Sequence, residues 1–145
     1  MLLTTIIYGG LQIRRQLSLR STLGRATDFP SGSVTAFDLR STLLDPDAAD
    51  PAAAELSPVP IYLVHVSEDE FLALLRRDPD SGCDVEWKAA GELFRDPCND
   101  STYNLRGERL SGPARRGLDR FPVIHVGRGN LQVNVELFQI GPTVP

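Results

Sequence analysis

The side chains that bind soft metals are scarce in this sequence. Its 145 residues include two cysteines, two histidines and one methionine. His65 and His125 each stand alone in an apolar run, which is typical of a half-buried strand residue. The chain also has no nucleophile elbow and no phosphate-binding loop. We therefore expect no catalytic residues and no enzyme activity of its own.

An excess of positive charge is also absent. Lys and Arg number 15, Asp and Glu number 19, and the two signs are mixed along the chain. Nucleic-acid-binding domains present a basic patch, so the net charge of −4 argues against a nucleic-acid partner. A small basic cluster contains Arg115, Arg116 and Arg120 beside Asp119, and we expect it to be a solvated loop.

No apolar run is long enough to cross a membrane by itself. The longest covers residues 1–13, whereas a helical span needs about 20 residues. The basic n-region and small-residue cleavage site of a signal peptide are missing as well. Residues 1–13 are therefore an incomplete span or a short helix that docks on a partner.

The rest of the chain is long enough for one domain with a hydrophobic core, and its patterns favour strands. Residues 33–39 and 60–66 are predicted strands, and residues 124–137 predict a hairpin around a Gly-Arg-Gly-Asn turn. Residues 45–58 are rich in Pro and Ala and predict a mobile surface loop. Residues 67–77 are ambiguous, because their start also has the pattern of a capped amphipathic helix.

Two short blocks contain both cysteines. Residues 78–83 are Asp-Pro-Asp-Ser-Gly-Cys, and residues 96–103 are Asp-Pro-Cys-Asn-Asp-Ser-Thr-Tyr. The blocks resemble the paired loops of the Rieske iron–sulfur family, Cys-x-His-x-Gly-Cys and Cys-x-Cys-His-Gly-Ser-x-Tyr. All four cluster-ligand positions are replaced, and they hold Asp78, Asp80, Asp96 and Asn99. Asp100 is a further departure, because it stands at a glycine of the family pattern.

The resemblance covers about residues 29–137. Val-Glu-Trp at 85–87 matches the strand that leaves the first loop, and residues 101–107 match the strand after the second. Gly-Pro-Ala at 112–114 matches the segment that covers the cluster in Rieske subunits of cytochrome bc-type complexes. The resemblance implies an all-β fold, a Rieske-like antiparallel β-sandwich with an inserted small subdomain of the cluster-binding type. It also favours a strand at residues 70–76.

The resemblance implies a division of the chain into two parts. Residues 1–26 would be a hydrophobic N-terminal segment, interpreted as a partial anchor, and a hinge. Residues 27–145 would be the Rieske-like domain, with the degenerate cluster-binding subdomain at about residues 78–112. Trp87 is predicted to be a core anchor between the sheets.

The resemblance also assigns roles to four residues of the loops. Cys83 and Cys98 fall where the family forms its loop-to-loop disulfide, and two free buried thiols in a reducing compartment are the alternative. Closing a loop of about 15 residues stabilises a protein by about 3 kcal/mol in the chain-entropy model. Ser101 and Tyr103 correspond to positions that hydrogen-bond the cluster and its cysteine ligand. Without a cluster, we expect Ser101 to end a loop and Tyr103 to pack in a strand.

The replaced ligands predict that the family cofactor, a [2Fe–2S] cluster, is absent. Such a centre needs two thiolates on one iron and two imidazoles on the other, whereas carboxylates suit calcium or magnesium. A calcium or magnesium site of Asp78, Asp80, Asp96 and Asn99 is the alternative; otherwise these side chains would splay into water. The resemblance to a calcium loop is incomplete, because Ala89 stands where the twelfth position needs Glu.

We therefore expect a cluster-less Rieske-like subunit with a structural or docking role in a membrane-associated respiratory or photosynthetic electron-transfer complex. Its partners would be cytochrome b-like or cytochrome c-like subunits, and at most it would be a non-catalytic subunit of an oxidoreductase complex. The expected location is the cell membrane, reached through the N-terminus, with the domain on the periplasmic or extracellular side. The alternatives are a [2Fe–2S] electron-transfer protein of the quinol–cytochrome c reductase type and a divalent-cation-binding scaffold module.

Overall fold

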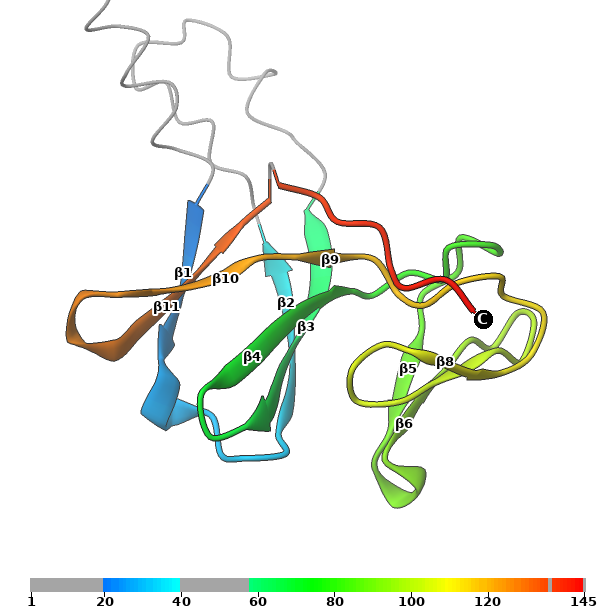
Figure 1. Ribbon diagram of the computed structural model, residues 1–145, viewed down its shortest axis with the longest axis horizontal. Helices are drawn as coiled ribbons and strands as arrows, with labels where there is room; N and C mark the ends of the chain where they lie inside the picture. Colours follow the sequence, from blue (N-terminus) through cyan, green and yellow to red (C-terminus); the bar gives the residue numbers. More distant parts are fainter. Residues whose placement is uncertain (1–19, 40–57, 136, 145) are drawn as a thin grey trace, which may run out of the picture.

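The computed structural model describes residues 20–39, 58–135 and 137–144, and strands dominate these residues. The strands form three antiparallel sheets with the orders β1-β11-β10, β2-β3-β4-β9 and β5-β6-β7-β8 (Figure 1). The first sheet contains β1 (Arg20–Arg25), β10 (Val123–Val126) and β11 (Asn130–Asn134). The second contains β2 (Val34–Leu39), β3 (Val59–Ser67), β4 (Glu70–Leu75) and β9 (Arg120–Phe121). The third contains β5 (Glu86–Lys88), β6 (Leu93–Arg95), β7 (Thr102–Tyr103) and β8 (Arg109–Ser111). Three short 3-10 helices are also described: η1 (Ala26–Asp28), η3 (Ala89–Gly91) and η4 (Gly127–Gly129).

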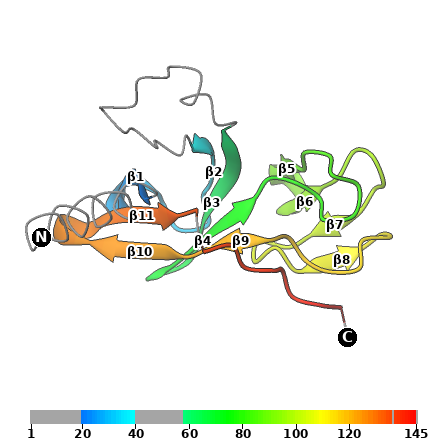
Figure 2. The same ribbon diagram turned by 90° about the horizontal axis from the view of Figure 1, so that it is seen from above.

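The third sheet is inserted into the other two. The chain leaves the second sheet after β4, builds β5 to β8, and returns to the second sheet at β9. Figures 1 and 2 show the first two sheets at one end of the molecule and the third at the other. This arrangement confirms the predicted all-β fold with an inserted small subdomain. The third sheet occupies residues 86–111, within the predicted span of 78–112.

Strand β3 is the centre of the second sheet because it is apolar along nearly its whole length. It pairs with β2 on one side and β4 on the other. Ile61, Leu63 and Val64 are at most 1% exposed, so the strand is buried on both faces. Strands buried on both faces have continuous apolar sequences instead of alternating ones.

Residues 70–75 form a strand, which confirms the preference for a strand over a helix in this segment. Ala73 and Leu74 are completely buried on opposite faces of β4, an arrangement that suits a strand between two packed layers. The Ser67 hydroxyl and the Glu70 carboxylate, whose spacing suggested a helix cap, lie 3.5 Å apart across the β3–β4 turn. Pairing with β3 therefore overrides the local helical pattern.

One hydrophobic cluster joins the second and third sheets. Its buried members come from β3, β4, the residue before β5, β6, β7 and the chain after β8: Val64, Leu74, Val85, Phe94, Tyr103, Ala114 and Leu118. Trp87 packs against it half-buried, with its ring centroid 4.9 Å from that of Phe94. Two further clusters, containing Ile61 and Leu63, fill the space between the first two sheets. The inserted subdomain thus shares a core with the base sheets.

The C-terminal segment, residues 137–144, runs back along the start of β9. The Gly117 N–H donates to the Pro142 carbonyl at 2.7 Å, and the Gly141 N–H donates to the buried Asp119 carboxylate at 2.9 Å. A Cβ on Gly141 would lie 2.1 Å from the Gly117 carbonyl oxygen. Only glycine permits this backbone approach.

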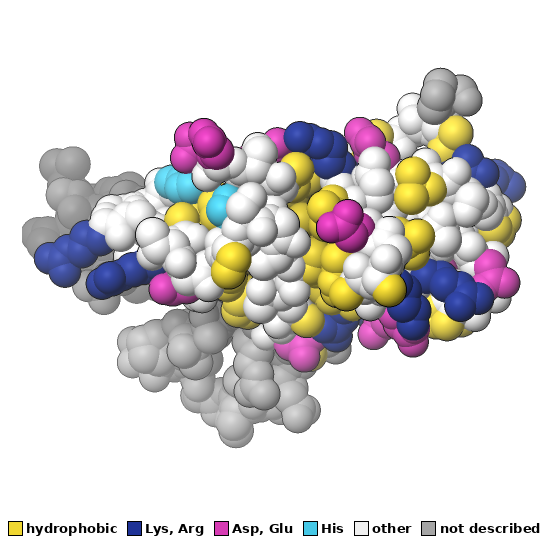
Figure 3. Space-filling model, turned by 90° about the horizontal axis from the view of Figure 1, so that it is seen from below, with side chains coloured by type: hydrophobic (Ala, Val, Ile, Leu, Met, Phe, Trp, Pro, Cys, Tyr) yellow, Lys and Arg dark blue, Asp and Glu magenta, His cyan; other side chains and the backbone are white. Residues whose placement is uncertain are grey.

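Charged groups on the lower face do not form a field of one sign. Figure 3 shows hydrophobic side chains across the middle of this face, with basic (Lys, Arg) and acidic (Asp, Glu) side chains interspersed around them. The predicted solvated arginine cluster is only partly correct. Arg115 is exposed, but Arg116 pairs with the buried Asp119, and Arg120 donates to the Arg106 carbonyl at 2.9 Å.

Two predictions of local structure need correction. Residues 20–25, assigned to the hinge, form β1, which pairs with β11 because β11 would otherwise be an open edge. His125 is exposed on β10, whereas His65 is buried on β3 and stacks on Phe71 with ring centroids 4.1 Å apart. The predicted N-terminal segment, residues 1–19, and most of the predicted loop at 45–58 lie outside the described residues.

The predicted location at the cell membrane is also corrected. Among residues 20–39, 58–135 and 137–144, no helix is both long enough and apolar enough to cross a bilayer. The location inferred from an N-terminal membrane anchor is therefore withdrawn.

Replacing Gly141 by Ala should destabilise the protein. The added Cβ would collide with backbone atoms of the Gly117–Leu118 segment, which cannot rotate away. We expect a loss of about 2 kcal/mol in the free energy of unfolding, measured by urea denaturation. Gly127→Ala is the matched control, because a Cβ there meets nothing within 4 Å. Equal stability of the two variants would contradict the proposed close approach.

Candidate functional site

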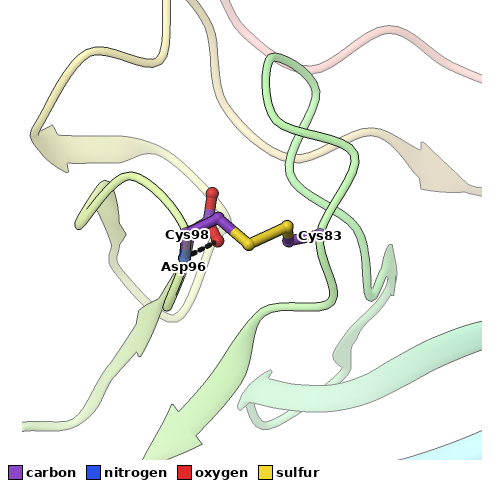
Figure 4. A group of neighbouring side chains, drawn as sticks. All are labelled: Cys83, Asp96 and Cys98. Carbon is purple, nitrogen blue, oxygen red and sulfur yellow. Dashed lines mark hydrogen bonds between the residues drawn. A yellow bond between two sulfur atoms is a disulfide. The ribbon is translucent and has the colours of Figure 1, made fainter.

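Two loops, residues 78–83 and 96–101, meet beside the third sheet. The first connects β4 to β5, and the second connects β6 to β7. A disulfide joins Cys83 to Cys98, with their Cα atoms 6.4 Å apart (Figure 4). Cys98 is exposed and Cys83 is half-buried, so the bridge lies at the surface. The pairing is the one that the family resemblance implied.

Asp78 is the buried centre of the first loop. Its carboxylate is 1% exposed, and its Oδ1 accepts the N–H groups of Asp80 at 2.7 Å and Ser81 at 2.9 Å. Its Oδ2 accepts the Tyr103 hydroxyl at 2.6 Å. The short Asp side chain commonly accepts a hydrogen bond from the backbone N–H two residues further along the chain, which explains the tight turn. The buried charge thus has three donors.

Asp96 holds the second loop in a similar way. It is completely buried, and its Oδ1 accepts the Cys98 N–H at 2.8 Å. Its Oδ2 accepts the Ser81 hydroxyl at 2.5 Å. Ser81 therefore connects the loops, because its N–H binds Asp78 and its hydroxyl binds Asp96.

The backbones of the two loops close by the same pattern. In the first loop, the Asp78 N–H donates to the Cys83 carbonyl at 2.8 Å, and the N–H of Gly82 donates back to the Asp78 carbonyl at 3.0 Å. In the second loop, the Asp96 N–H donates to the Ser101 carbonyl at 2.8 Å, and the Asp100 N–H donates back to the Asp96 carbonyl at 3.0 Å. Asp78 and Asp96, which the resemblance aligns with the cysteine ligands, thus begin two equivalent turns.

Burial and hydrogen bonding act in opposite directions on Asp78. Burial alone would raise the pKa of its carboxyl, because the charged form loses hydration. The hydrogen bonds from Tyr103 and from the N–H groups of Ser81 and Asp80 outweigh this effect and hold the pKa below its ordinary value. Burial, together with the bond to Asp78, raises the pKa of the Tyr103 phenol. The pair is therefore an anionic carboxylate and a neutral phenol.

The side chains of Asp80 and Asn99, which the resemblance aligns with the histidine ligands, do not bind Asp78 or Asp96. Asp80 is exposed, and the half-buried Asn99 turns its amide oxygen to the Ser101 N–H at 2.9 Å. The expectation that the side chains would splay into water therefore fits Asp80 but is wrong for Asp78 and Asp96. Ser81 connects the carboxylates of Asp78 and Asp96, whereas the side chains of Asp80 and Asn99 are not joined to them.

The four ligand positions do not fit a [2Fe–2S] cluster. They present oxygen donors, and carboxylates are hard ligands that suit calcium or magnesium better than the iron of such a cluster. The neighbouring sulfur atoms are joined to each other in the disulfide. A cluster of this type requires thiolates and imidazoles, which the four positions lack.

Ser101 closes the site from another side. Its buried hydroxyl accepts the Ala114 N–H at 3.0 Å, which fixes the Gly-Pro-Ala segment against the second loop. A Cβ on Gly112 would lie 2.4 Å from the Ser101 Cα, so this approach also requires glycine. Ser101 does end a loop as expected, while Tyr103 packs in β7 and also has a buried carboxylate partner.

Ser81 is a residue of the network that was not singled out from the sequence, and Asp100 was noted there only as a departure from the family pattern. Ser81 has a usable signal, because Ser three places after Asp commonly forms local side-chain bonds in a turn. Asp100 has a φ of 63°, a left-handed conformation that explains the family glycine and that Asp tolerates better than most residues. Its carboxylate pairs with Arg95 on the preceding strand.

Comparisons with known proteins give a short sequence match and two similar folds. No family model matches the chain. A segment of 38 residues is 45% identical to the cytochrome b6-f complex iron–sulfur subunit of Synechococcus sp. (strain JA-3-3Ab). That segment is 26% of this chain and spans 22% of the length of the relative.

Two solved structures have a similar fold. The cyanobacterial plasma membrane Rieske protein PetC3 from Synechocystis PCC 6803 aligns with a TM-score of 0.56 at 22% identity, covering 78% of this chain and 97% of that one. A chain from the complex of reduced oxygenase and oxidized ferredoxin in carbazole 1,9a-dioxygenase aligns with a TM-score of 0.52 at 16% identity, covering 88% and 98%.

Replacing Tyr103 by Phe should destabilise the protein in a pH-dependent way. The variant removes one donor from the buried Asp78 carboxylate, so we expect a loss of about 2 kcal/mol at neutral pH in urea denaturation. Because the folded-state pKa of Asp78 is lowered, its contribution is present above the ordinary value of 3.8 and disappears as the pH falls through the lower folded value. The difference between wild type and variant should therefore shrink in acid.

Tyr62→Phe is the matched control for this experiment. The Tyr62 hydroxyl donates to the uncharged Val85 carbonyl at 3.0 Å, so the cost of its removal should not change over the same pH range. A pH-independent cost for Tyr103→Phe would contradict an ionised Asp78.

The sequence resemblance and the structure agree on the fold. The paired loops, the disulfide between them and the subdomain inserted between β4 and β9 are found together in one all-β domain. The chain therefore has the Rieske fold and resembles Rieske iron–sulfur proteins.

Proposed function

We propose that this chain is a cluster-less Rieske-like subunit with a structural or docking role in an electron-transfer complex of the respiratory or photosynthetic type. One observation carries the proposal. Asp78 and Asp96 stand at the cysteine-ligand positions as buried carboxylates with donors on both oxygens. Hydrogen bonds and a disulfide then do the structural work that a metal cluster does in the Rieske family.

The hydrogen-bond partners of the buried polar side chains support this interpretation. Removing a metal from a site built for it would leave buried groups without partners, which is costly. Among the described residues, the one buried side-chain atom without a hydrogen-bond partner is the Ser33 hydroxyl oxygen, which does not belong to the loops. The loops are therefore complete with their own side chains, and the fold can persist without iron.

The exposed surface of the loops supports a docking role. Asp80, Ser81, Gly82, Pro97 and Cys98 are exposed side by side in the two loops that the disulfide joins. A preordered surface loses little conformational entropy on binding, which favours association. The matched relative is named as a subunit of a cytochrome b6-f complex, so cytochrome b-like or cytochrome c-like subunits are the partners that we propose.

The absence of a cluster can be tested directly. Protein expressed with an active iron–sulfur assembly system should contain less than about 0.1 iron and 0.1 acid-labile sulfide per chain, because the four ligand positions lack sulfur and imidazole. Its visible and EPR spectra should lack Rieske features. Iron and sulfide in a stoichiometric amount would overturn the proposal and favour an electron-transfer protein.

The docking role has a separate test. The tagged chain, isolated from its native host, should co-elute with haem-containing proteins that are identified by their absorption spectra. Asp80→Lys reverses a charge on the exposed loop surface and should reduce co-elution at least several-fold. Asp69→Lys, on the exposed β3–β4 turn, makes the same charge change and should leave co-elution unchanged. Equal effects of both variants would contradict docking through the loops.

A further inference from the structure

Three potential metal-ligand atoms gather where the two loops meet. The Sγ atoms of Cys83 and Cys98 and a carboxylate oxygen of Asp96 all lie within 4.8 Å of one another. Figure 4 shows the Asp96 carboxylate beside Cys98, next to the disulfide. Among the described residues, this is the one such trio of His, Cys, Asp or Glu side chains. In the oxidised protein the two sulfur atoms bond to each other instead.

We propose that reduction of the Cys83–Cys98 disulfide converts this trio into a binding site for a thiophilic divalent cation, zinc above all. The two thiolates and the Asp96 carboxylate would supply three ligands, and water would supply the fourth. This site is distinct from the four former cluster-ligand positions except at Asp96. It does not depend on the proposed docking role.

The donor set matches the chemistry of zinc. Thiolates are soft ligands that select zinc over calcium and magnesium, and carboxylates also bind zinc. At Zn–S distances of about 2.3 Å, tetrahedral geometry places the two sulfurs about 3.8 Å apart. The Cα atoms of the two cysteines are 6.4 Å apart, so rotation about χ1 reaches that sulfur separation without backbone movement.

Asp96 is held in place for this role. Its Oδ1 accepts a hydrogen bond from the Cys98 N–H, and its Oδ2 accepts one from the Ser81 hydroxyl. A carboxylate oxygen has two lone pairs, so each retains one for a metal. Hydrogen bonds of this kind orient a ligand and increase metal affinity. The Asp78 carboxylate, connected through Ser81, adds negative charge that favours a cation.

A dithiol can reduce the Cys83–Cys98 disulfide. The dithiol transfers two electrons and two protons to the Cys83–Cys98 bond, which breaks to give two thiols while the dithiol becomes a disulfide. Zinc then displaces the two thiol protons and binds the thiolates. Access for the reductant is open, because Cys98 is exposed. Exchange with an external disulfide removes two electrons from the two thiolates, which re-forms the Cys83–Cys98 bond, releases the zinc ion and converts the external disulfide into two thiolates.

The test compares zinc binding by the reduced and oxidised protein. After reduction with a dithiol and removal of the reductant under anaerobic conditions, we expect one zinc per chain, and none in the oxidised protein. Cobalt in place of zinc should give the intense ligand-field bands of a tetrahedral thiolate site. Asp96→Asn should weaken zinc binding at least ~10-fold, while Asp80→Asn, a change of the same charge at an exposed position, should not.

A double variant separates the thiolates from the effect of opening the disulfide. Cys83→Ser/Cys98→Ser lacks the bridge in every condition and should bind no zinc. Circular dichroism of each form shows whether its β-structure remains, since an unfolded dithiol chain also binds zinc. Equal binding by the oxidised protein or by the double variant would overturn the proposal. So would zinc bound by a reduced chain that stays unfolded, or cobalt bands without thiolate character.

Discussion

The loops depend on the hydrogen bond between the Tyr103 hydroxyl and the buried Asp78 carboxylate. Removing a carboxylate from water is unfavourable unless hydrogen bonds replace its hydration. Tyr103 supplies one from β7, and the loop supplies two from its own N–H groups. The contact thus ties the end of β4 to the third sheet and makes the first loop a fixed part of the subdomain.

From Asp78 the network continues to the second loop. Ser81 donates to both buried aspartates, and the disulfide joins Cys83 to Cys98 over a separation of 15 residues. Noncovalent and covalent links therefore act on the same pair of turns. The hydrophobic cluster below, which includes Val85 and Tyr103, fixes the turns to the base sheets. These contacts explain how a Rieske fold remains ordered with carboxylates at its ligand positions.

Several features could be predicted from the sequence because they depend on local patterns or on a recognisable family motif. The central strand β3 follows from its apolar run, and the pairing of Cys83 with Cys98 follows from the family resemblance. Other features depend on contacts between distant segments. The pairing of β1 with β11 joins residues more than 100 positions apart, and Gly141 meets Gly117 only after the C-terminal segment folds back. Neither contact has a local signal.

The amino-acid sequence by itself determined the chemistry of the two loops: oxygen side chains at the four positions that the resemblance aligns with cluster ligands, and two cysteines to join the loops. Only the tertiary structure decided that Asp78 and Asp96 are buried and bound while Asp80 is exposed. The reason is that burial depends on neighbours from elsewhere in the chain. Tyr103 lies 25 residues beyond Asp78, and Ser81 lies 15 residues before Asp96. Those contacts decide whether each side chain meets water or a hydrogen-bond donor.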